Sequence, residues 1–311
     1  MQFEQPGSYQ QAGGTYSEPL SRQRKGFLVF LLDQSTSMSD EVTWKGHKLT
    51  LAQMATSILN GLLVTVIENA KVDPQTGRRK NNCDILIYGY GDQVKPLLNS
   101  KGSPISVPDL ANNPTARHMV RITRYDSVKG QNVTVDEEQP YWIVAHSGGN
   151  WTEMAAAVDN GRQAVERWFT DDPRHRLSFP PIVINITDGK HNGKNNGDPV
   201  QEAMKLQQLG TDDGKVLFFN CHITQANAQK LSFPSEIKQI EQLNLSEEDL
   251  KGARQLFNMS SIVPKTMAVR AQHVFNRTLQ PGARGFMYNA SPQDLFTFLS
   301  WGTRQSSESV K

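Results

Sequence analysis

The chain has 311 residues and a formal net charge of +2 at pH 7, so it is long enough for one large domain with a sizeable core. This near balance of charge requires neither a nucleic-acid partner nor a membrane surface, and no continuous apolar run reaches the roughly 18 residues of a membrane helix. The first residues lack the basic start and apolar core of a secretory signal, so no such signal is expected.

Residues 1–24 are rich in Gln, Gly, Ser and Tyr without apolar periodicity, and they are predicted to be a flexible N-terminal tail. Six apolar residues, 27–32, then run directly into Asp33. A short unbroken apolar run predicts a strand that is buried on both faces, as in the centre of a parallel sheet. Asp33, Ser35 and Ser37 therefore fall on the loop at the carboxyl end of this strand, where ligands bind in open α/β sheets.

The next segments predict a polar loop, a helix and a two-stranded edge. Residues 38–48 are polar, and residues 50–70 repeat apolar side chains at helical spacing. Residues 83–90 predict a second buried strand. A Gly-Asp turn then leads to a short antiparallel edge strand at 94–98, where a proline is acceptable.

Residues 99–147 are predicted to form an insertion of one or two hairpins, because a structureless loop of that length is improbable in a compact domain. Within it, residues 118–125 alternate and residues 141–145 are apolar, so both are predicted strands. A glycine-rich loop at 147–152 follows, and a helix is predicted at 153–169.

The second half of the chain continues to alternate between strand and helix. Its predicted elements are a strand at 181–187 that ends in Asp188, a helix at 199–209, a strand at 215–223, one or two helices over 246–279, a strand at 284–289, a helix at 291–301 and a polar C-terminal tail at 303–311. This order predicts an α/β fold with a doubly wound, mostly parallel central sheet, helices on both faces and one antiparallel edge strand.

Three loops supply candidate metal ligands. Asp33 and Asp188 each end an apolar strand, and their carboxylates converge if the two strands are neighbours at the switch point of the sheet. The glycine-rich loop lets Thr152 approach closely, because glycine removes steric bulk. Carboxylate and hydroxyl oxygens are hard donors, which suit Mg²⁺, with Mn²⁺ as the other possibility, and do not suit zinc. The predicted ligands are Asp33, Ser35, Ser37, Thr152 and Asp188.

These motifs, in this order and at strand ends, resemble the metal-ion-dependent adhesion site of von Willebrand factor A (VWA) domains over roughly residues 25–302. The resemblance implies that the three hydroxyl groups bind the ion directly and that the two carboxylates act through water. Two residues separate Gly149 from Thr152, a spacing that some family members share. The family's strand order, 3-2-1-4-5-6, implies that Cys83 and Cys221 lie roughly 14 Å apart, too far for a disulfide.

With most direct ligands neutral, the bound ion prefers an anionic sixth ligand, such as a Glu or Asp carboxylate of a partner protein. Residues that flank the site in sequence are predicted to contact this partner: Trp44, Lys45, His47, Trp151, Lys190, His191 and Lys194. The chain is thus expected to be a non-enzymatic, Mg²⁺-dependent adaptor. Intracellular bacterial VWA proteins of this type, in tellurite-resistance or stress-response systems, imply a PP2C-type phosphatase, a Ser/Thr kinase or an AAA+ ATPase as partner.

Several alternatives stay open. A metal-dependent phosphohydrolase needs a nucleophile or general base near the metal, and no unassigned Asp, His or Cys is obviously placed. An RNA-associated VWA protein is disfavoured by the near-zero net charge. Ser35 and Ser37 could cap the following helix, Asp188 could be a turn residue, the two tryptophans could be packing residues, and the lysines of 190–194 could be solvated loop charges.

The cysteines and the glycosylation sequons both favour a cytoplasmic location. Cys83 and Cys221, the two cysteines of the chain, fall within apolar runs and are predicted to be buried apolar side chains. The sequons at Asn150 and Asn185 lie in the glycine-rich loop and in a predicted buried strand, where a glycan could not be tolerated.

Overall fold

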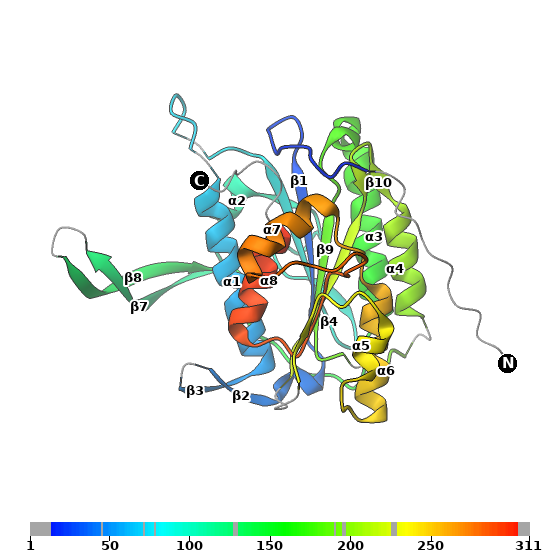
Figure 1. Cartoon of the computed structure of the whole chain (residues 1–311). Coiled ribbons are helices and arrows are strands. Elements are labelled where there is room, and N and C mark those ends of the chain that lie inside the picture. The colour runs from blue at the N-terminus through cyan, green and yellow to red at the C-terminus, as the bar shows by residue number, and fades with distance from the viewer. Residues whose placement is uncertain are drawn as a thin grey trace.

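A computed structural model describes residues 14–44, 46–70, 72–77, 79–126, 130–189, 191–194, 197–224 and 229–303. Its centre is an eight-stranded sheet in which seven strands follow the order β13-β14-β12-β9-β1-β4-β5 and β6 also pairs with β4 (Figure 1). The strands are β1 (Gly26–Asp33), β4 (Cys83–Tyr90), β5 (Val94–Pro96), β6 (Ile105–Ser106), β9 (Ile182–Thr187), β12 (Leu217–His222), β13 (Leu231–Ser232) and β14 (Phe286–Tyr288).

The central strands are parallel and both edges are antiparallel. β1 pairs in parallel with β4 and β9, and β12 pairs in parallel with β9 and β14. β5 and β6 run antiparallel to β4, and β13 runs antiparallel to β14. The predicted α/β fold with an antiparallel edge strand is therefore confirmed. The strand order is the one that the resemblance implies, with β13 and β6 added at the edges.

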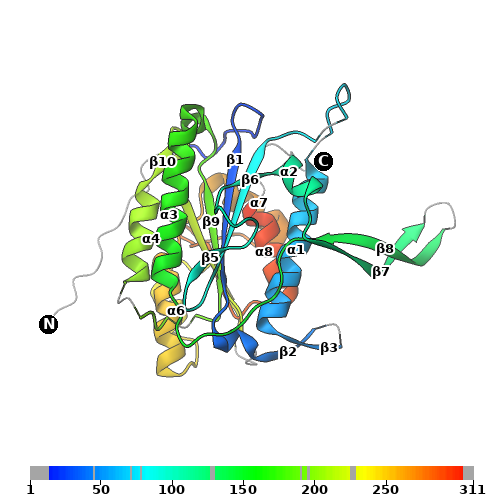
Figure 2. The same cartoon turned by 180° about the vertical axis from the view of Figure 1, so that it is seen from behind.

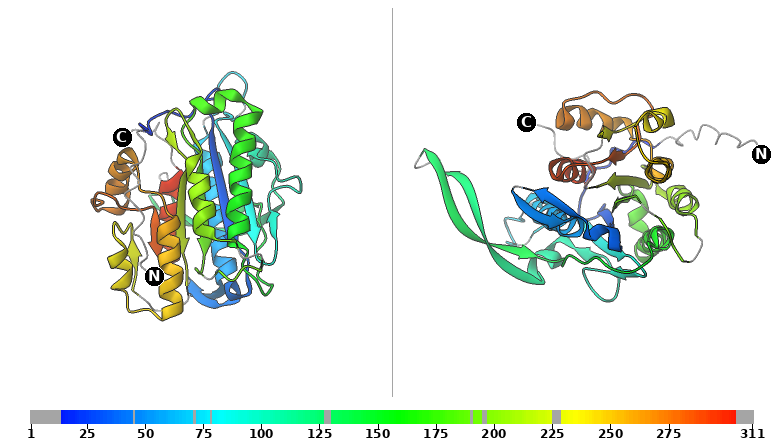
Figure 3. Two further views of the ribbon diagram at one scale, coloured as in Figure 1. Left: turned by 90° about the vertical axis from the view of Figure 1, so that its right-hand side faces the viewer. Right: turned by 90° about the horizontal axis from the view of Figure 1, so that it is seen from below.

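Helices cover both faces of the sheet (Figures 1, 2 and 3). One face carries α1 (Leu51–Asn69), α2 (Val107–Asn112), α7 (Lys265–Phe275) and α8 (Pro292–Thr303), and the other carries α3 (Met154–Asp171), α4 (Pro199–Gln208), α5 (Ile237–Glu241) and α6 (Glu247–Met259). Two 3-10 helices, η1 (Thr36–Ser39) and η2 (Pro173–Leu177), and three hairpins complete the described elements. The hairpins are β2 (Glu41–Trp44) with β3 (His47–Thr50), β7 (Ala116–Asp126) with β8 (Gln131–Tyr141), and β10 (Gly210–Thr211) with β11 (Gly214–Lys215).

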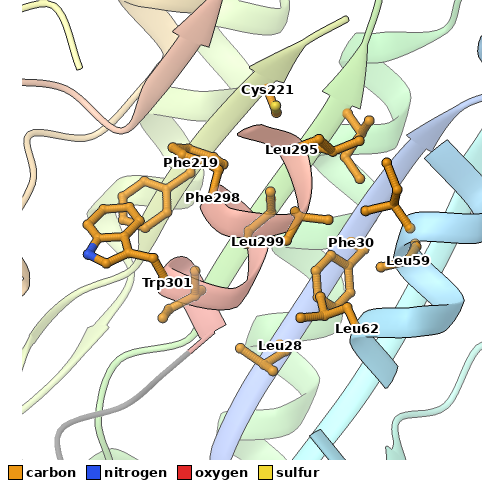
Figure 4. Packing of buried hydrophobic residues seen from close by; sticks show 14 of the residues in the cluster. Leu28, Phe30, Leu59, Leu62, Phe219, Cys221, Leu295, Phe298, Leu299 and Trp301 are labelled. Atoms are coloured by element: carbon orange, nitrogen blue, oxygen red, sulfur yellow. The ribbon is translucent and has the colours of Figure 1, made fainter. Parts of the chain in front are cut away.

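The sequence pattern of β1 explains the two cores. All eight residues of β1 are buried, and alternate side chains enter opposite faces because successive residues of a strand point to opposite sides. Leu28 and Phe30 pack among side chains of α1 and α8 (Figure 4). Phe27, Val29 and Leu31 point to the opposite face and belong to the cluster that contains the buried side chains of α3. β1 thus lies in the middle of the domain, and Asp33 lies at its carboxyl end.

Helix α1 has the length and hydropathy of a membrane-spanning helix. This was not expected, because the sequence contains no continuous apolar run of that length. Its buried side chains pack on the sheet, and 61% of the apolar window lies inside the domain. Thr50 caps its start, accepting a hydrogen bond from the backbone N–H of Gln53, and the Gln53 side chain completes the capping box.

The insertion contains one long hairpin, β7–β8, which projects from the body of the domain (Figures 1 and 2). The predicted strand at 141–145 is wrong beyond Tyr141, because the backbone there pairs with a side chain of α1. Asn60 Oδ1 accepts hydrogen bonds from the N–H groups of Trp142 and Ile143, and its Nδ2 donates to the Ile143 carbonyl oxygen. A single buried amide therefore anchors the base of the hairpin.

Replacing Asn60 by leucine should lower the free energy of unfolding by about 2–4 kcal/mol, because two N–H groups and one carbonyl group would stay buried without partners. Chemical denaturation followed by circular dichroism measures this change. Asn160 on α3 is the control: it is half-buried and hydrogen-bonds one carbonyl of its own helix, so Asn160→Leu should cost less than about 1 kcal/mol. An equal loss in both variants would contradict the anchoring role.

The prediction of a flexible tail is wrong for residues 14–24, while residues 1–13 lie outside the described residues. Tyr16 is buried against Phe179, and its hydroxyl accepts a hydrogen bond from the N–H of Lys215. The Asp213 carboxylate accepts hydrogen bonds from the Thr15 hydroxyl and from two backbone N–H groups of the same segment. These partners are almost 200 residues away along the chain, so local composition gave no sign of them.

The predicted polar loop at 38–48 covers the end of η1 and most of the β2–β3 hairpin, so it is more ordered than expected. Gly46, with φ of +79°, allows the tight turn between the two strands. Polar residues gave this segment a loop composition, although their backbone groups pair across the hairpin.

Candidate metal centre

Asp33 lies where β1 ends beside β9, at the point of the sheet where the strand order reverses. Its side chain is fully buried. One carboxylate oxygen accepts a hydrogen bond from the backbone N–H of Ser35 at 2.9 Å, and the other accepts one from the Thr187 hydroxyl at 2.7 Å. Both contacts fix the carboxylate at the carboxyl edge of the sheet.

The serine hydroxyls lie side by side directly after this aspartate. Ser35 Oγ and Ser37 Oγ are 3.1 Å apart, and Ser35 is buried. Ser35 occupies the N-cap position of η1 without making a side-chain capping hydrogen bond, so the capping alternative is not observed for this residue. The two oxygens are therefore close enough to bind one ion together.

The glycine-rich loop lies against the loop that follows β1. The N–H of Gly148 donates to the Gln34 carbonyl oxygen at 2.9 Å, and the Thr36 hydroxyl donates to the carbonyl oxygen of Gly149. At the end of this loop Thr152 is 4% exposed. The loop contacts thus bring Thr152 to the same edge of the sheet as Asp33.

Asp188 directly follows β9, whose residue Ile186 pairs with Leu32 of β1, so the strand register places Asp188 at the same end of the sheet as Asp33. Burial, and then the negative charge of Asp188, raise the pKa of Asp33 to about 7. Within the described residues, the other groups that act on this pKa are Thr187 and Ser35, and neither is a cation. Two carboxylates therefore lie at the neighbouring ends of β1 and β9, and no cationic side chain of the described residues is among the groups that act on the pKa of Asp33.

This arrangement fits a divalent cation. A buried carboxylate beside a second carboxylate is costly unless a positive charge balances them, and the neighbouring hydroxyl pair offers further hard oxygen donors. The described residues contain no cluster of three or more His, Cys, Asp and Glu side chains suited to a metal, so this donor set differs from a carboxylate-rich or zinc-type site. Hydroxyl and carboxylate oxygens are hard donors, so the site fits a hard divalent cation.

A buried polar network beneath this edge was not predicted. The Tyr90 hydroxyl donates to Asn185 Oδ1 at 2.7 Å, and Asn185 Nδ2 donates to Asn220 Oδ1 at 3.0 Å. Burial, and then the charge of Asp33, raise the pKa of Tyr90 well above its ordinary value. The signal was present: each asparagine interrupts an otherwise apolar strand, and a buried amide requires hydrogen-bond partners.

The loop after β9 packs against the glycine-rich loop. Asn192 Oδ1 accepts a hydrogen bond from the Thr152 N–H at 2.8 Å, and Nδ1 of His191 lies 2.9 Å from the Thr152 carbonyl oxygen. The other ring nitrogen of His191 lies 3.2 Å from the carbonyl oxygen of Gly197. His191, predicted to contact a partner, thus has both ring nitrogens beside carbonyl groups of its own chain.

The other predicted partner residues occupy different environments, and their role stays a prediction. Trp151 is 40% exposed, next to Thr152. Trp44 on β2 is half-buried and packs against the core, whereas His47 on β3 and Lys194 are exposed. Lys45 and Lys190 lie outside the described residues.

No protein-family model matches the chain, and no curated protein sequence matches it. Among solved structures, it is similar to proximal thread matrix protein 1 from the mussel byssus, with 14% identity and a TM-score of 0.44 over 91% of this chain and 48% of that one. It is also similar to a von Willebrand factor type A protein from Catenulispora acidiphila, with 11% identity and a TM-score of 0.44 over 92% of this chain and 44% of that one. A third similar structure is the manganese-loaded TRAP protein of Plasmodium vivax, with 18% identity and a TM-score of 0.33 over 68% of this chain and 61% of that one.

The chain spans less than half the length of the first two of these proteins and less than two thirds of the third. At these identities and scores the similarity says nothing about function. The strand order makes the fold a doubly wound sheet, and the contacts around Asp33 place the candidate site at its switch point.

Proposed function

We propose that this chain is a VWA-type binding module that holds Mg²⁺ or Mn²⁺ and uses the ion to capture an acidic residue of a partner protein. The observation that supports this most directly is that Asp33 and Asp188 lie at the neighbouring ends of β1 and β9, at the switch point of the sheet, beside a pair of serine hydroxyls 3.1 Å apart. Thr152, on the loop that packs against them, completes the proposed ligand set.

The side chains around the ion have separate roles in this proposal. Thr187 and the N–H of Ser35 hold the two oxygens of Asp33, so its carboxylate keeps one orientation when it loses its proton. The hydroxyl donors carry no charge, so a bound ion would supply the Lewis acidity that attracts a carboxylate from outside. Trp151, exposed beside Thr152, is the proposed aromatic anchor for the partner.

We propose a cytoplasmic, non-enzymatic adaptor in a bacterial stress or phospho-signalling system, with a PP2C-type phosphatase, a Ser/Thr kinase or an AAA+ ATPase as partner. The site supports binding rather than hydrolysis, because both carboxylates belong to the proposed ligand set and so leave neither as a general base.

The proposed function is tested by capture of the partner from a host lysate in the presence of Mg²⁺. We expect the purified chain to retain a protein in Mg²⁺ and to release it when EDTA removes the ion. The Asp188→Ala variant should retain little of it, whereas Asp212→Ala, which removes an exposed carboxylate from the β10–β11 turn, should behave as the wild type. Equal retention in EDTA would contradict a metal-bridged contact, and phosphatase activity of the chain alone would favour the enzyme alternative.

A further inference from the structure

The backbone of the loop that carries Thr152 is hydrogen-bonded to Asp92, which lies in the turn between β4 and β5. One oxygen of the Asp92 carboxylate accepts hydrogen bonds from the N–H groups of Asn150 and Trp151, both at 2.8 Å. Gly149 has a φ of +93°, and a Cβ atom there would lie 2.6 Å from Cγ of Asp92. The carboxylate thus fills the space that the glycine leaves and sets the path of the loop.

The backbone of the same loop is also hydrogen-bonded to Asn192, which lies in the loop after β9. Its Oδ1 accepts the Thr152 N–H at 2.8 Å, and its Nδ2 donates to the Asn150 carbonyl oxygen at 3.3 Å. Three consecutive backbone N–H groups, at 150, 151 and 152, therefore donate to side-chain oxygens from two different loops. Together these contacts fix the backbone up to and including Thr152, the proposed hydroxyl ligand.

We infer that Asp92 and Asn192 are positioning residues that make the site selective for small octahedral ions over Ca²⁺. This inference rests on the proposed function. Mg²⁺ requires near-ideal octahedral geometry with oxygens at about 2.0–2.1 Å, whereas Ca²⁺ accepts six to eight oxygens at about 2.3–2.6 Å in flexible arrangements. A hydroxyl ligand on a fixed backbone cannot move outward to accommodate the larger ion, so rigidity favours the smaller one.

The proposed role of Asp92 depends on its hydrogen bonds and not on its negative charge, so two variants of this residue should behave differently. Asp92→Ala removes the acceptor of two N–H groups and frees the loop. Asp92→Asn keeps an amide oxygen where the carboxylate oxygen lies, so it preserves the two hydrogen bonds without the negative charge. The conservative variant should therefore restore the behaviour that alanine loses.

The experiment measures Mg²⁺ and Ca²⁺ affinity of the full chain by isothermal titration calorimetry. The wild type should prefer Mg²⁺. Asp92→Ala should lose about tenfold in Mg²⁺ affinity, because freeing a hydrogen-bonded ligand loop costs about the energy of one strong hydrogen bond, and it should keep its Ca²⁺ affinity within about threefold. Asn192→Ala should likewise lower the ratio of the two affinities, whereas Asp92→Asn should keep it near the wild-type value.

Each outcome has a separate meaning. A wild type that binds neither ion would contradict the proposed function itself. A wild type that binds Mg²⁺, with an unchanged affinity ratio in Asp92→Ala, would overturn the positioning role while leaving the metal site intact. A loss in Asp92→Asn as large as in Asp92→Ala would show that charge rather than loop geometry matters, which also overturns it. Melting in EDTA confirms that the variants are folded, with Asp212→Ala as the matched control.

Discussion

Replacing Asp188 by alanine should abolish measurable Mg²⁺ binding and remove the rise in Tm that the ion produces in the wild type. The proposed ligand set has two carboxylates and three neutral hydroxyls, so this change removes half of the negative charge. Because the number of charged ligands tunes the affinity of such sites, we expect a loss of at least about 100-fold, or about 3 kcal/mol. Isothermal titration calorimetry and differential scanning calorimetry, each with Mg²⁺ and with EDTA, measure the two effects.

The same variant has a second expected property that separates lost binding from lost folding. The charge of Asp188 raises the pKa of Asp33, which means that the two carboxylates repel each other in the metal-free chain. Asp188→Ala relieves this repulsion, so in EDTA its Tm should equal or exceed that of the wild type. Wild-type Mg²⁺ affinity in Asp188→Ala would contradict the proposed site, and Asp212→Ala should leave both affinity and Tm unchanged.

The parts of the fold that follow from local pattern were predictable from the sequence. The apolar runs of β1 and β9, each followed by an aspartate, indicated buried parallel strands, and their neighbouring positions in the sheet bring Asp33 and Asp188 together. Helical spacing likewise located α1 and α3 within one or two residues. In each case the information lies within about twenty consecutive residues, so periodicity alone reveals it.

The parts that depend on distant partners were not predictable in this way. Tyr16 is ordered because it packs on Phe179 and meets the loop at Asp213, and Asp92 acts on a loop about 60 residues further along the chain. Nothing in the composition around these residues differs from that of a mobile segment or an ordinary turn. A single sequence gives residue types, whereas these roles are set by which segments the fold places side by side.

The polar network beneath the site shows how the two kinds of information combine. Asn185 was assigned to a buried strand from its neighbours, yet its own role appears only when Tyr90 and Asn220 are seen on the adjacent strands. The strand register places this network and Asp33 on the same face of the sheet, and all four side chains are fully buried. The ionisation of the buried Asp33 carboxylate is therefore expected to depend closely on whether the site holds a cation.

The metal-free wild type should lose stability as the pH rises from about 4 to about 7, relative to Asp33→Asn. The pKa of Asp33 is raised to about 7 in the folded chain, chiefly by burial and then by Asp188, while in the unfolded chain it takes its ordinary value of 3.8. Because the folded state then binds the proton more tightly, this residue's contribution is fully present below the unfolded pKa and is lost as the pH passes through the folded one.

At about pH 8 in EDTA, Asp33→Asn should therefore be more stable than the wild type by on the order of 2–4 kcal/mol, since one pKa unit corresponds to about 1.4 kcal/mol. Saturating Mg²⁺ should reverse the order at this pH, because the ion stabilises the ionised carboxylate that the amide variant lacks. Below about pH 7 the wild type should lose Mg²⁺ affinity by up to about tenfold per pH unit, because protonation of Asp33 removes a negative charge that the ion requires. Urea denaturation of both proteins across this pH range, with Mg²⁺ and with EDTA, measures all three effects. Parallel stability curves for the two proteins in EDTA would show that Asp33 is not the buried, charge-strained group that the site requires.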